Sequence, residues 1–460
     1  MEIMSYTRRS FLQTAATASL PFILPSHLWA AATKASNKFG LGFIGYGQRA
    51  HSLLRNFLSQ EEVQVLAVCD VDTTRREFAR KTVEEHYSGN AGPKTPCATY
   101  NDFRELIARK DIDAVCIATP DHWHTIPLLA ALNAGKDAYC EKPLTHTIHE
   151  SVAVLEAMKS GERIMQTGSI QRSMKEFRIA CELVLNGAIG RVERVECSFG
   201  GPPIPCELPE EPLEPGLDWN LWLGPAPTRA YNTILSPRGM PQHFPQWRKY
   251  IEYGSGGVGD WGAHQLDIAQ WGLGMDGSGP VAALPPSSPE ATQGAKLVYA
   301  NGITVEHKKG FGVDFFGTEG RVRVNRGKFV FEHQGKTIAS FADKKGKKDL
   351  DTSCAAEVAK AEKAFLKDAK IKLYASQNHI SDFIACMKSR KKPITSEQVG
   401  ARSAICCHLL NQAYLHKQKI EWDPTKLAFA GTTCDPKWMT KEYRQPWSVE
   451  AQGRWLPAPR

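Results

Sequence analysis

A glycine-rich turn between an apolar run and a helical pattern constrains this chain more than any other feature. The run Phe39–Ile44 has the length and composition of a buried strand, and it is followed by Gly45-Tyr46-Gly47-Gln48-Arg49-Ala50 and then by apolar residues at helical spacing. In this G-x-G-x-x-A pattern the first glycine permits a tight turn, the second lets the backbone approach a pyrophosphate, and the small last residue lets the helix pack on the strand. The free N–H groups of the helix then face the phosphates. We predict a dinucleotide site formed by Gly45, Tyr46, Gly47, Gln48 and Arg49.

A second apolar run ends in an acid at the position expected for a ribose contact. Val63–Cys69 reads as a strand, and Asp70 follows it directly. A carboxylate at this point repels a 2′-phosphate, which favours NAD as the cofactor over NADP. Arg75 and Arg76 follow closely, so NADP stays open as the less favoured cofactor. The structural alternative is a doubly wound domain that binds no nucleotide.

Two more predicted strands end in polar motifs. The run 114–118 reads as a buried parallel strand and leads into Thr119-Pro120-Asp121-His122-Trp123-His124, and the strand Asp137–Cys140 leads into Glu141-Lys142-Pro143. Ligands of open α/β sheets bind at the carboxyl ends of strands. We therefore expect the following residues near the cofactor, with a purely structural role left open for the histidine: Thr119, Pro120, His124, Glu141 and Lys142.

Length and charge exclude several classes of protein. A chain of 460 residues is expected to form two domains. The net charge is +8, but the basic residues are spread out, and the densest run, 344–348, reads as a solvated loop, so we expect no nucleic-acid partner. The twelve cysteines form no C-x-x-C pair, and several lie in predicted buried strands. We expect reduced thiols and no metal site.

The first 32 residues have the layout of a cleavable export signal. Arg8-Arg9 precedes Phe11-Leu12, a modestly apolar stretch at 14–24 and small residues at 30–32, which resembles a twin-arginine signal. The apolar stretch is shorter than the roughly 20 residues that span a bilayer. We expect a periplasmic mature protein without membrane insertion. The alternative is a disordered leader with a chance pair of arginines.

Four motifs together resemble the glucose–fructose oxidoreductase/inositol dehydrogenase (Gfo/Idh/MocA) family. They are Gly45-Tyr46-Gly47, Thr119-Pro120 followed by His124, Glu141-Lys142-Pro143, and the D-x-G-x-H-x-x-D pattern of residues 260–267. The resemblance covers about residues 38–280 and continues in places to 388. It implies an α/β protein with an NAD-binding Rossmann domain (37–165). A substrate-binding and oligomerisation domain with a large, mostly antiparallel sheet follows (166–460), in a homodimer or homotetramer.

The resemblance also implies the catalytic residues. Members of this family commonly oxidise or reduce a carbon of a sugar or cyclitol at the nicotinamide, which requires a proton acceptor and a donor for the developing alkoxide. Lys142 is expected to polarise the reacting oxygen and relay its proton. Asp260 and His264 share a helix face if that segment is helical, with His264 as proton acceptor, unless it only satisfies backbone groups at a helix start. Arg172 aligns with a family position at the domain junction, where it is expected to touch cofactor or substrate.

Aromatic residues in the second half suit a carbohydrate. Trp247 and Arg248 end the segment 242–248, where rings stand among hydrogen-bonding groups, as sugar binding requires; packing of a loop-rich domain is the alternative. The tail from Pro424 is expected to wrap over a neighbouring subunit. Our prediction is an exported NAD(P)-dependent sugar, cyclitol or glycoside oxidoreductase that retains and internally recycles its cofactor. The alternatives are an NAD-dependent glycoside hydrolase or lyase acting by transient oxidation, and a non-catalytic sugar-binding relative.

Overall fold

The computed structural model describes residues 37–88, 96–237, 244–342 and 350–449. The predicted export signal, the lysine-rich run 344–348 and the start of the segment 242–248 lie outside these ranges. Contacts divide the chain into Met1–Lys38 and Phe39–Arg460, and the description below concerns the second unit.

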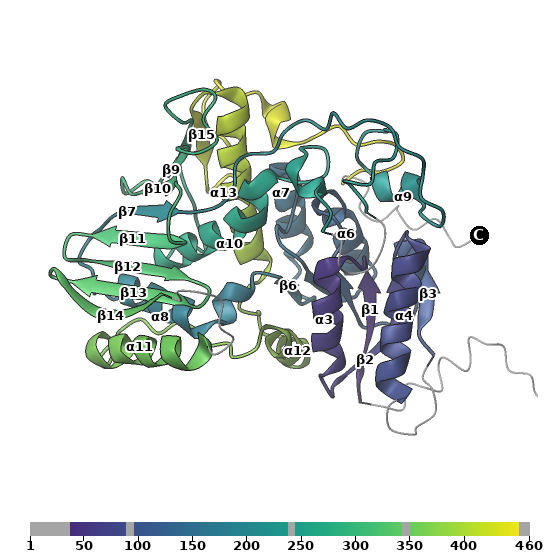
Figure 1. Ribbon diagram of the computed structural model, residues 1–460, viewed down its shortest axis with the longest axis horizontal. Coiled ribbons are helices and arrows are strands. Elements are labelled where there is room, and N and C mark those ends of the chain that lie inside the picture. The colour runs from purple at the N-terminus through teal and green to yellow at the C-terminus, as the bar shows by residue number, and fades with distance from the viewer. Residues whose placement is uncertain (1–36, 89–95, 238–243, 343–349, 450–460) are drawn as a thin grey trace, which may run out of the picture. The chain divides into compact units, whose positions relative to one another are not determined.

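Six parallel strands form the first sheet, in the order β3-β2-β1-β4-β5-β6 (Figure 1). This order reverses between β1 and β4, which is the switch point of a Rossmann fold, so the predicted fold of the first domain is confirmed. The strands are β1 Phe39–Ile44, β2 Val63–Cys69, β3 Ala98–Tyr100, β4 Ala114–Ile117, β5 Asp137–Cys140 and β6 Met165–Thr167.

Helices from both ends of the chain cover this sheet. Phe57 of α3 lies 5.8 Å from the ring of Tyr139 on β5, and both rings contact Phe383 of α12, at 6.3 and 6.0 Å. Because α12 comes from far along the sequence, the C-terminal part of the chain helps to bury the first sheet. The helices are α3 Gln48–Leu58, α4 Thr73–Ser88, α5 Phe103–Ile107, α6 Thr125–Asn133, α7 Ile148–Ala157 and α12 His379–Ser389.

The first sheet extends past the predicted boundary between the two domains. Strand β6, Met165–Thr167, pairs with β5 and so carries the first sheet past residue 165. Helix α13, Glu397–His416, packs on that strand so closely that a Cβ at Gly400 would lie 2.0 Å from Thr167 Oγ1. The second part of the chain is thus built onto the edge of the Rossmann sheet.

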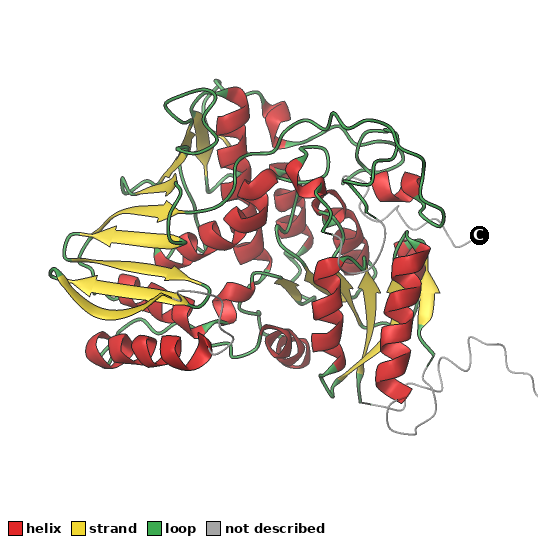
Figure 2. Cartoon of the chain, viewed as in Figure 1, coloured by secondary structure: helices red, strands yellow, loops and turns green. Residues whose placement is uncertain are grey.

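Ten strands form the second sheet, in the order β14-β13-β12-β11-β7-β10-β9-β8-β15-β16. Figure 2 shows strands of this sheet in yellow at the left, with helices packed beside them. All its pairs are antiparallel except β7 with β10, which confirms the large, mostly antiparallel sheet. The strands are β7 Val192–Cys197, β8 Ala282–Leu284, β9 Lys296–Val298, β10 Thr304–His307, β11 Val313–Gly317, β12 Gly320–Asn325, β13 Lys328–His333, β14 Lys336–Ala342, β15 Ile420–Asp423 and β16 Ala428–Phe429.

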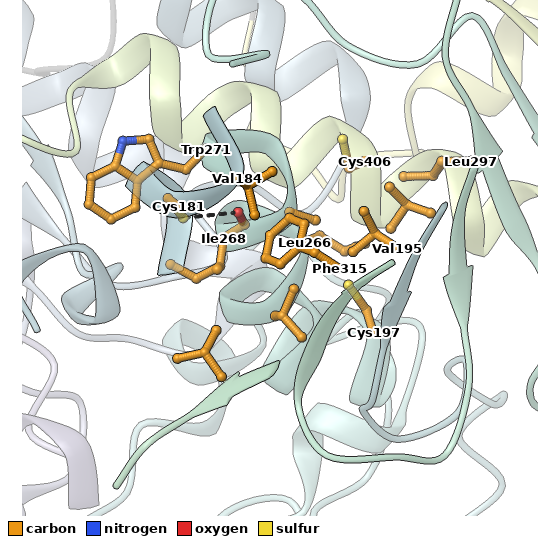
Figure 3. Packing of buried hydrophobic residues seen from close by; sticks show 14 of the residues in the cluster. Cys181, Val184, Val195, Cys197, Leu266, Ile268, Trp271, Leu297, Phe315 and Cys406 are labelled. Carbon is orange, nitrogen blue, oxygen red and sulfur yellow. Dashed lines mark hydrogen bonds between the residues drawn. The ribbon is translucent and has the colours of Figure 1, made fainter. Parts of the chain in front are cut away.

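Helices α8 (Lys175–Leu185), α10 (Gly256–Gly272), α11 (Leu350–Phe365) and α13 cover one face of this sheet. Figure 3 shows the apolar cluster beneath them, in which Trp271 and Leu266 of α10 pack with Val184 and Phe315. All twelve cysteines are free thiols, and all but Cys206 are buried. In the described part of the chain, no helix combines the length and the apolar character needed to cross a membrane.

The described part of the C-terminal tail packs on its own chain. Trp447 lies 4.7 Å from the ring of Trp123 and 6.2 Å from Phe103, both in the Rossmann domain. Lys441 donates to His146 Nδ1 at 2.8 Å, and Tyr443 donates to the buried carboxylate of Glu150, also at 2.8 Å. The tail therefore packs against the outer side of the first domain.

Candidate active site

A cleft of about 450 Å³ opens at the carboxyl ends of β1, β2, β4 and β5, between the Rossmann turns and helix α10. Every predicted site residue except Arg172 lines it. Its lining includes Gly45, Tyr46, Gly47, Gln48, Arg49, Asp70, Thr119, Pro120, His124, Glu141, Lys142, Trp247, Arg248, Asp260 and His264.

The glycine-rich turn has the shape that a dinucleotide needs. Gly45 adopts φ +84°, and a Cβ there would lie 2.8 Å from the backbone nitrogen of Thr119, so no side chain fits. A Cβ at Gly47, in contrast, would meet nothing within 4 Å. This open space lies at the start of α3, whose first N–H groups are free to bind a pyrophosphate. The turn therefore fits the predicted cofactor.

Asp70 is fixed at the end of β2 by the backbone around it. Its Oδ2 accepts from Tyr46 N at 2.6 Å and its Oδ1 from Asp72 N at 2.9 Å. Burial raises the pKa of this carboxyl. The neighbouring Arg75 is held by Asp72 at 2.9 Å, and Arg76 donates to the Asp70 carbonyl at 2.5 Å, so both cations already bind their own chain.

Glu141 forms an ion pair that closes the floor of the cleft. Arg49 Nε donates to Glu141 Oε1 at 2.7 Å, and Lys142 N donates to its Oε2 at 3.2 Å. Burial acts to raise the pKa of Glu141, but the charges of Arg49 and Lys142 outweigh it and lower the pKa. A Cβ at Gly168 would lie 2.7 Å from this carboxyl group, so the glycine leaves room for the pair.

His124 joins the two polar motifs. Its Nδ1 lies 2.6 Å from the Pro143 carbonyl and its Nε2 lies 3.0 Å from the Thr119 carbonyl. Burial lowers its pKa, so the ring is neutral and donates to one of the two carbonyls. This supports the structural role that the sequence left open.

Lys142 and Asp260 meet across the cleft. The ammonium Nζ of Lys142 donates to Asp260 Oδ1 at 2.5 Å and to the Asp260 carbonyl at 2.9 Å. Burial acts to raise the pKa of Asp260, but the charges of Lys142 and Arg248 outweigh it and lower the pKa. Asp260 is thus ionised and positions the Lys142 ammonium.

His264 lies one turn after Asp260 on α10, as the predicted helix required. Its Nε2 lies 3.1 Å from Nη2 of Arg326, while its buried Nδ1 has no hydrogen-bond partner among the residues that the structure describes. Burial, Lys142 and Arg326 lower the pKa of His264 well below its ordinary value. A ring with this pKa is a poor proton acceptor, which argues against the role predicted for it.

Aromatic rings and a guanidinium form the outer wall of the cleft. Arg248 lies over the ring of Trp247 at 4.2 Å and over Phe244 at 4.8 Å, and its Nε is 3.7 Å from Asp260 Oδ1. Phe244 and Trp261, which also line the cleft, are 56% and 44% exposed.

Arg172 does not reach the cleft. Its side chain is 2% exposed, and it forms ion pairs with Asp267 at 2.8 Å and Asp276 at 2.7 Å. The guanidinium also lies 4.9 Å over the ring of Trp271. Arg172 thus anchors α10 in the core instead of touching cofactor or substrate, and Asp267 of the recognised motif is its partner.

Sequence reasoning missed several lining residues, among them Asp121, Trp261 and Arg326. Asp121 and Trp261 lie inside the motifs at 119–124 and 260–267, so their positions could have identified them as lining residues. Arg326 lies in the turn between β12 and β13, and no motif pointed to it. Burial raises the pKa of Asp121 to about 7. In the described residues, no cluster of three or more histidine, cysteine or acidic side chains could hold a metal ion.

Comparisons with known proteins agree with this architecture. The model of an oxidoreductase family's NAD-binding Rossmann fold matches residues 39–169. The model of an oxidoreductase family's C-terminal alpha/beta domain matches residues 205–343. The chain therefore carries an NAD-binding Rossmann domain, followed by the second domain of the same kind of enzyme.

Individual relatives match over shorter stretches. An α-N-acetylgalactosaminidase of Shewanella oneidensis is 31% identical over 162 residues, which are 35% of this chain and 34% of the relative. An inositol 2-dehydrogenase of Salmonella paratyphi B is 33% identical over 152 residues, 33% of this chain and 42% of the relative. The chain thus matches well under half of the length of these curated relatives. The WlbA dehydrogenase of Bordetella pertussis, solved with NADH and UDP-GlcNAcA, aligns with a TM-score of 0.56 at 14% identity over 84% of this chain and 99% of its own, which shows the shared fold.

Proposed function

The chain belongs to the Gfo/Idh/MocA family of oxidoreductases, and from this premise we propose that it transfers a hydride to or from a hydroxyl carbon of a sugar, cyclitol or glycoside. The observation that carries the proposal is the contact of Lys142 with Asp260 inside the dinucleotide cleft, at 2.5 Å. The chemistry that a bound NAD supplies is acceptance and return of a hydride.

Lys142 is the residue that we assign to the reacting oxygen. Its ammonium is oriented by two acceptors on Asp260, and the group follows β5 directly, on the same side of the sheet as the glycine-rich turn. A positioned cation at a hydroxyl oxygen stabilises the negative charge that develops during oxidation. As the hydroxyl proton moves to Nζ, the ammonium passes one of its own protons to the Asp260 carboxylate, so Lys142 keeps its charge and Asp260 becomes protonated.

His264 serves as a hydrogen-bond donor in this proposal. Because Arg326 occupies Nε2, the neutral ring carries its proton on Nδ1, the nitrogen that has no partner. An N–H at that position suits a substrate hydroxyl or carbonyl oxygen. Asp260 and His264 then fix the substrate while Lys142 handles the proton.

The adenosine end of the cleft supports NAD over NADP. The Asp70 carboxylate is held at the end of β2, and Arg75 and Arg76 are bound to acceptors of their own chain. A 2′-phosphate would meet a fixed negative charge without a free cation, whereas a ribose hydroxyl can donate to Asp70.

We also propose that the protein is exported to the periplasm and that it retains its bound dinucleotide. The arginine pair at residues 8–9 supports passage through the twin-arginine route, which carries folded proteins, and hence a periplasmic location. No free NAD pool re-oxidises a released cofactor there, so the dinucleotide stays bound and returns to its starting state. A homo-oligomer is proposed from family resemblance alone, and light scattering of the purified protein measures it.

A second candidate is an NAD-dependent glycosidase that oxidises a glycoside, eliminates the aglycone and reduces the product again. The match to the Shewanella α-N-acetylgalactosaminidase favours it. Release of nitrophenol from nitrophenyl glycosides, without net change in the nicotinamide absorbance, distinguishes this activity from a dehydrogenase. A non-catalytic relative would hold a dinucleotide whose absorbance responds to no carbohydrate.

The test is a comparison of two lysine variants. Lys142→Met is expected to slow the sugar-dependent change in nicotinamide absorbance by about 10²–10⁴-fold while NADH still binds. Lys159→Met is the matched control, because this lysine of the same domain is 71% exposed and pairs only with Glu156. Unchanged turnover in Lys142→Met removes Lys142 from the mechanism.

A further inference from the structure

The substrate side of the cleft holds two guanidinium groups with unused donors. Nη1 of Arg248 and Nε of Arg326 are both buried and have no hydrogen-bond partner among the described residues. A buried donor without an acceptor destabilises the folded state, and a charged donor does so more strongly. Both arginines nevertheless line the cleft, so their side chains are placed to meet an anionic ligand there.

These two arginines are held in place by rings and by α10. Arg248 lies over Trp247 and Phe244, and Arg326 lies 4.8 Å over Trp261. Nε of Arg248 lies 3.7 Å from Asp260 Oδ1, and Nη2 of Arg326 lies 3.1 Å from His264 Nε2. The two guanidinium groups therefore approach residues one helical turn apart on the helix that carries the proposed catalytic residues.

The nearby carboxylates do not neutralise them. Glu141 is paired with Arg49 at 2.7 Å, and Asp260 is paired first with Lys142 at 2.5 Å. A third acid near these arginines, Asp121, is buried with a pKa raised to about 7, so near neutral pH it is only partly ionised. Burial and the charge of Arg49 lower the pKa of Arg326, as expected for a cation short of counter-charge. These three carboxylates thus leave Arg248 and Arg326 without a counter-charge of their own.

We propose that Arg248 and Arg326 form a carboxylate subsite, and that the substrate is an acidic sugar such as a uronic or aldonic acid. This inference rests on the proposed function and narrows its substrate class. A planar guanidinium donates two parallel hydrogen bonds to a carboxylate, which a neutral hydroxymethyl group cannot accept in the same way. The partly exposed rings of Phe244 and Trp261 then contact the C–H face of the sugar ring.

The other anion that could meet these donors is the cofactor pyrophosphate. Its place is at Gly47 and the start of α3, where the backbone leaves open space. Arg248 instead belongs to the short helical turn Trp247–Lys249, which packs on α10. We therefore assign the subsite to the substrate, and the experiment separates the two sources.

The experiment compares sugars that differ only in a carboxylate. Calorimetry of the NAD-loaded protein measures the affinities for D-glucuronate against D-glucose, D-galacturonate against D-galactose, and D-gluconate against D-glucitol. NADH affinity and nicotinamide absorbance are measured in parallel. The variants are Arg248→Gln and Arg326→Gln. The control is Arg194→Gln, since Arg194 also lies over a ring, Phe316 at 3.7 Å, but belongs to the second sheet and not to the cleft.

The expected result is that one acid or more binds at least about tenfold more tightly than its neutral partner, and that both cleft variants abolish this preference while Arg194→Gln keeps it. Equal affinity within every pair, or no binding of any acid, overturns the inference. A loss of NADH affinity in either variant with the acid preference intact assigns the arginines to the pyrophosphate and also overturns it. Tight binding of an acid without any response of the nicotinamide absorbance upholds the subsite but contradicts the proposed oxidoreductase. Nicotinamide turnover with neutral sugars alone upholds the oxidoreductase and overturns the subsite.

Discussion

Arg326 Nη2 donates a hydrogen bond to His264 Nε2 at 3.1 Å, across 62 residues of sequence. A guanidinium has only donors, so the imidazole nitrogen must accept, and the ring proton must be on Nδ1. A positive charge at this distance also opposes protonation of the ring. The contact therefore fixes both the tautomer and the charge of His264, and with them the part that it can take in catalysis.

Removal of the Arg326 charge is expected to raise the pKa of His264. In Arg326→Met one of the charges that lower this pKa is gone, whereas burial and Lys142 still act. Nitrogen NMR of the histidine side chains measures both the pKa and the tautomer. Arg323→Met is the control, because Arg323 on the same hairpin lies over Phe311 at 5.1 Å. An unchanged pKa in Arg326→Met, or a wild-type ring protonated at Nε2, contradicts this account.

The two glycines of the turn are expected to respond in opposite ways. Gly45→Ala forces a side chain into φ +84° and against the Thr119 backbone, and should cost about 1–3 kcal/mol in the free energy of unfolding. Gly47→Ala meets no atom within 4 Å, and its backbone at φ −86° suits alanine, so stability should change by less than about 1 kcal/mol. NADH affinity should nevertheless fall in Gly47→Ala. Urea unfolding and NADH fluorescence test both; a Gly47→Ala protein with full NADH affinity would show that the pyrophosphate lies elsewhere.

Asp121 is expected to make stability depend on pH near neutrality. Burial raises its pKa from 3.8 to about 7, so the protonated form favours folding. That stability is fully present below the unfolded pKa and is lost as pH rises through the folded pKa, by up to about 1.4 kcal/mol per pH unit. Asp121→Asn should remove this fall between about pH 4 and pH 7. Urea unfolding across this range measures the slope, and equal slopes for the two proteins would show that Asp121 is ionised throughout.

The packing of the C-terminal tail on Trp123 is expected to support the cofactor cleft. Trp123 lines the cleft and packs on Trp447, which is 4% exposed, so Trp447→Ala should cost about 3–5 kcal/mol and weaken NADH binding. Trp438→Ala is the matched change in the same tail, since its ring stacks on His416 at 3.5 Å, and Trp438 does not line the cleft. This variant should retain NADH affinity in its folded fraction. Equal NADH affinities in both variants would show that the packing of Trp447 does not affect the cofactor site.

The local patterns of the sequence were sufficient for the first domain. The apolar run Val63–Cys69 and the strand Asp137–Cys140 have their predicted bounds, because buried parallel strands are continuous apolar segments that end at polar turns. Asp260 and His264 share a helix, as their spacing predicted. These features depend on neighbours within a few residues, which a sequence pattern records.

The features that sequence reasoning missed depend on contacts between distant segments. Arg172 meets Asp267 only after α10 is placed, and a buried arginine has the same sequence signature as one in a cleft. Arg326 reaches His264 from a β-turn that carries no motif. The path of the tail depends on the contact between the rings of Trp447 and Trp123, and no local sequence pattern around either residue indicates this contact.

The most direct test of the central claim is the absorbance of the purified protein loaded with NAD, recorded before and after addition of paired acidic and neutral sugars. We expect the reduced-nicotinamide band to rise with at least one sugar, and we expect Lys142→Met to lose this response while it still binds NADH. A protein that binds NADH but shows no such response to any sugar in either redox direction would contradict the assignment of Lys142, Asp260 and His264 to hydride-transfer chemistry.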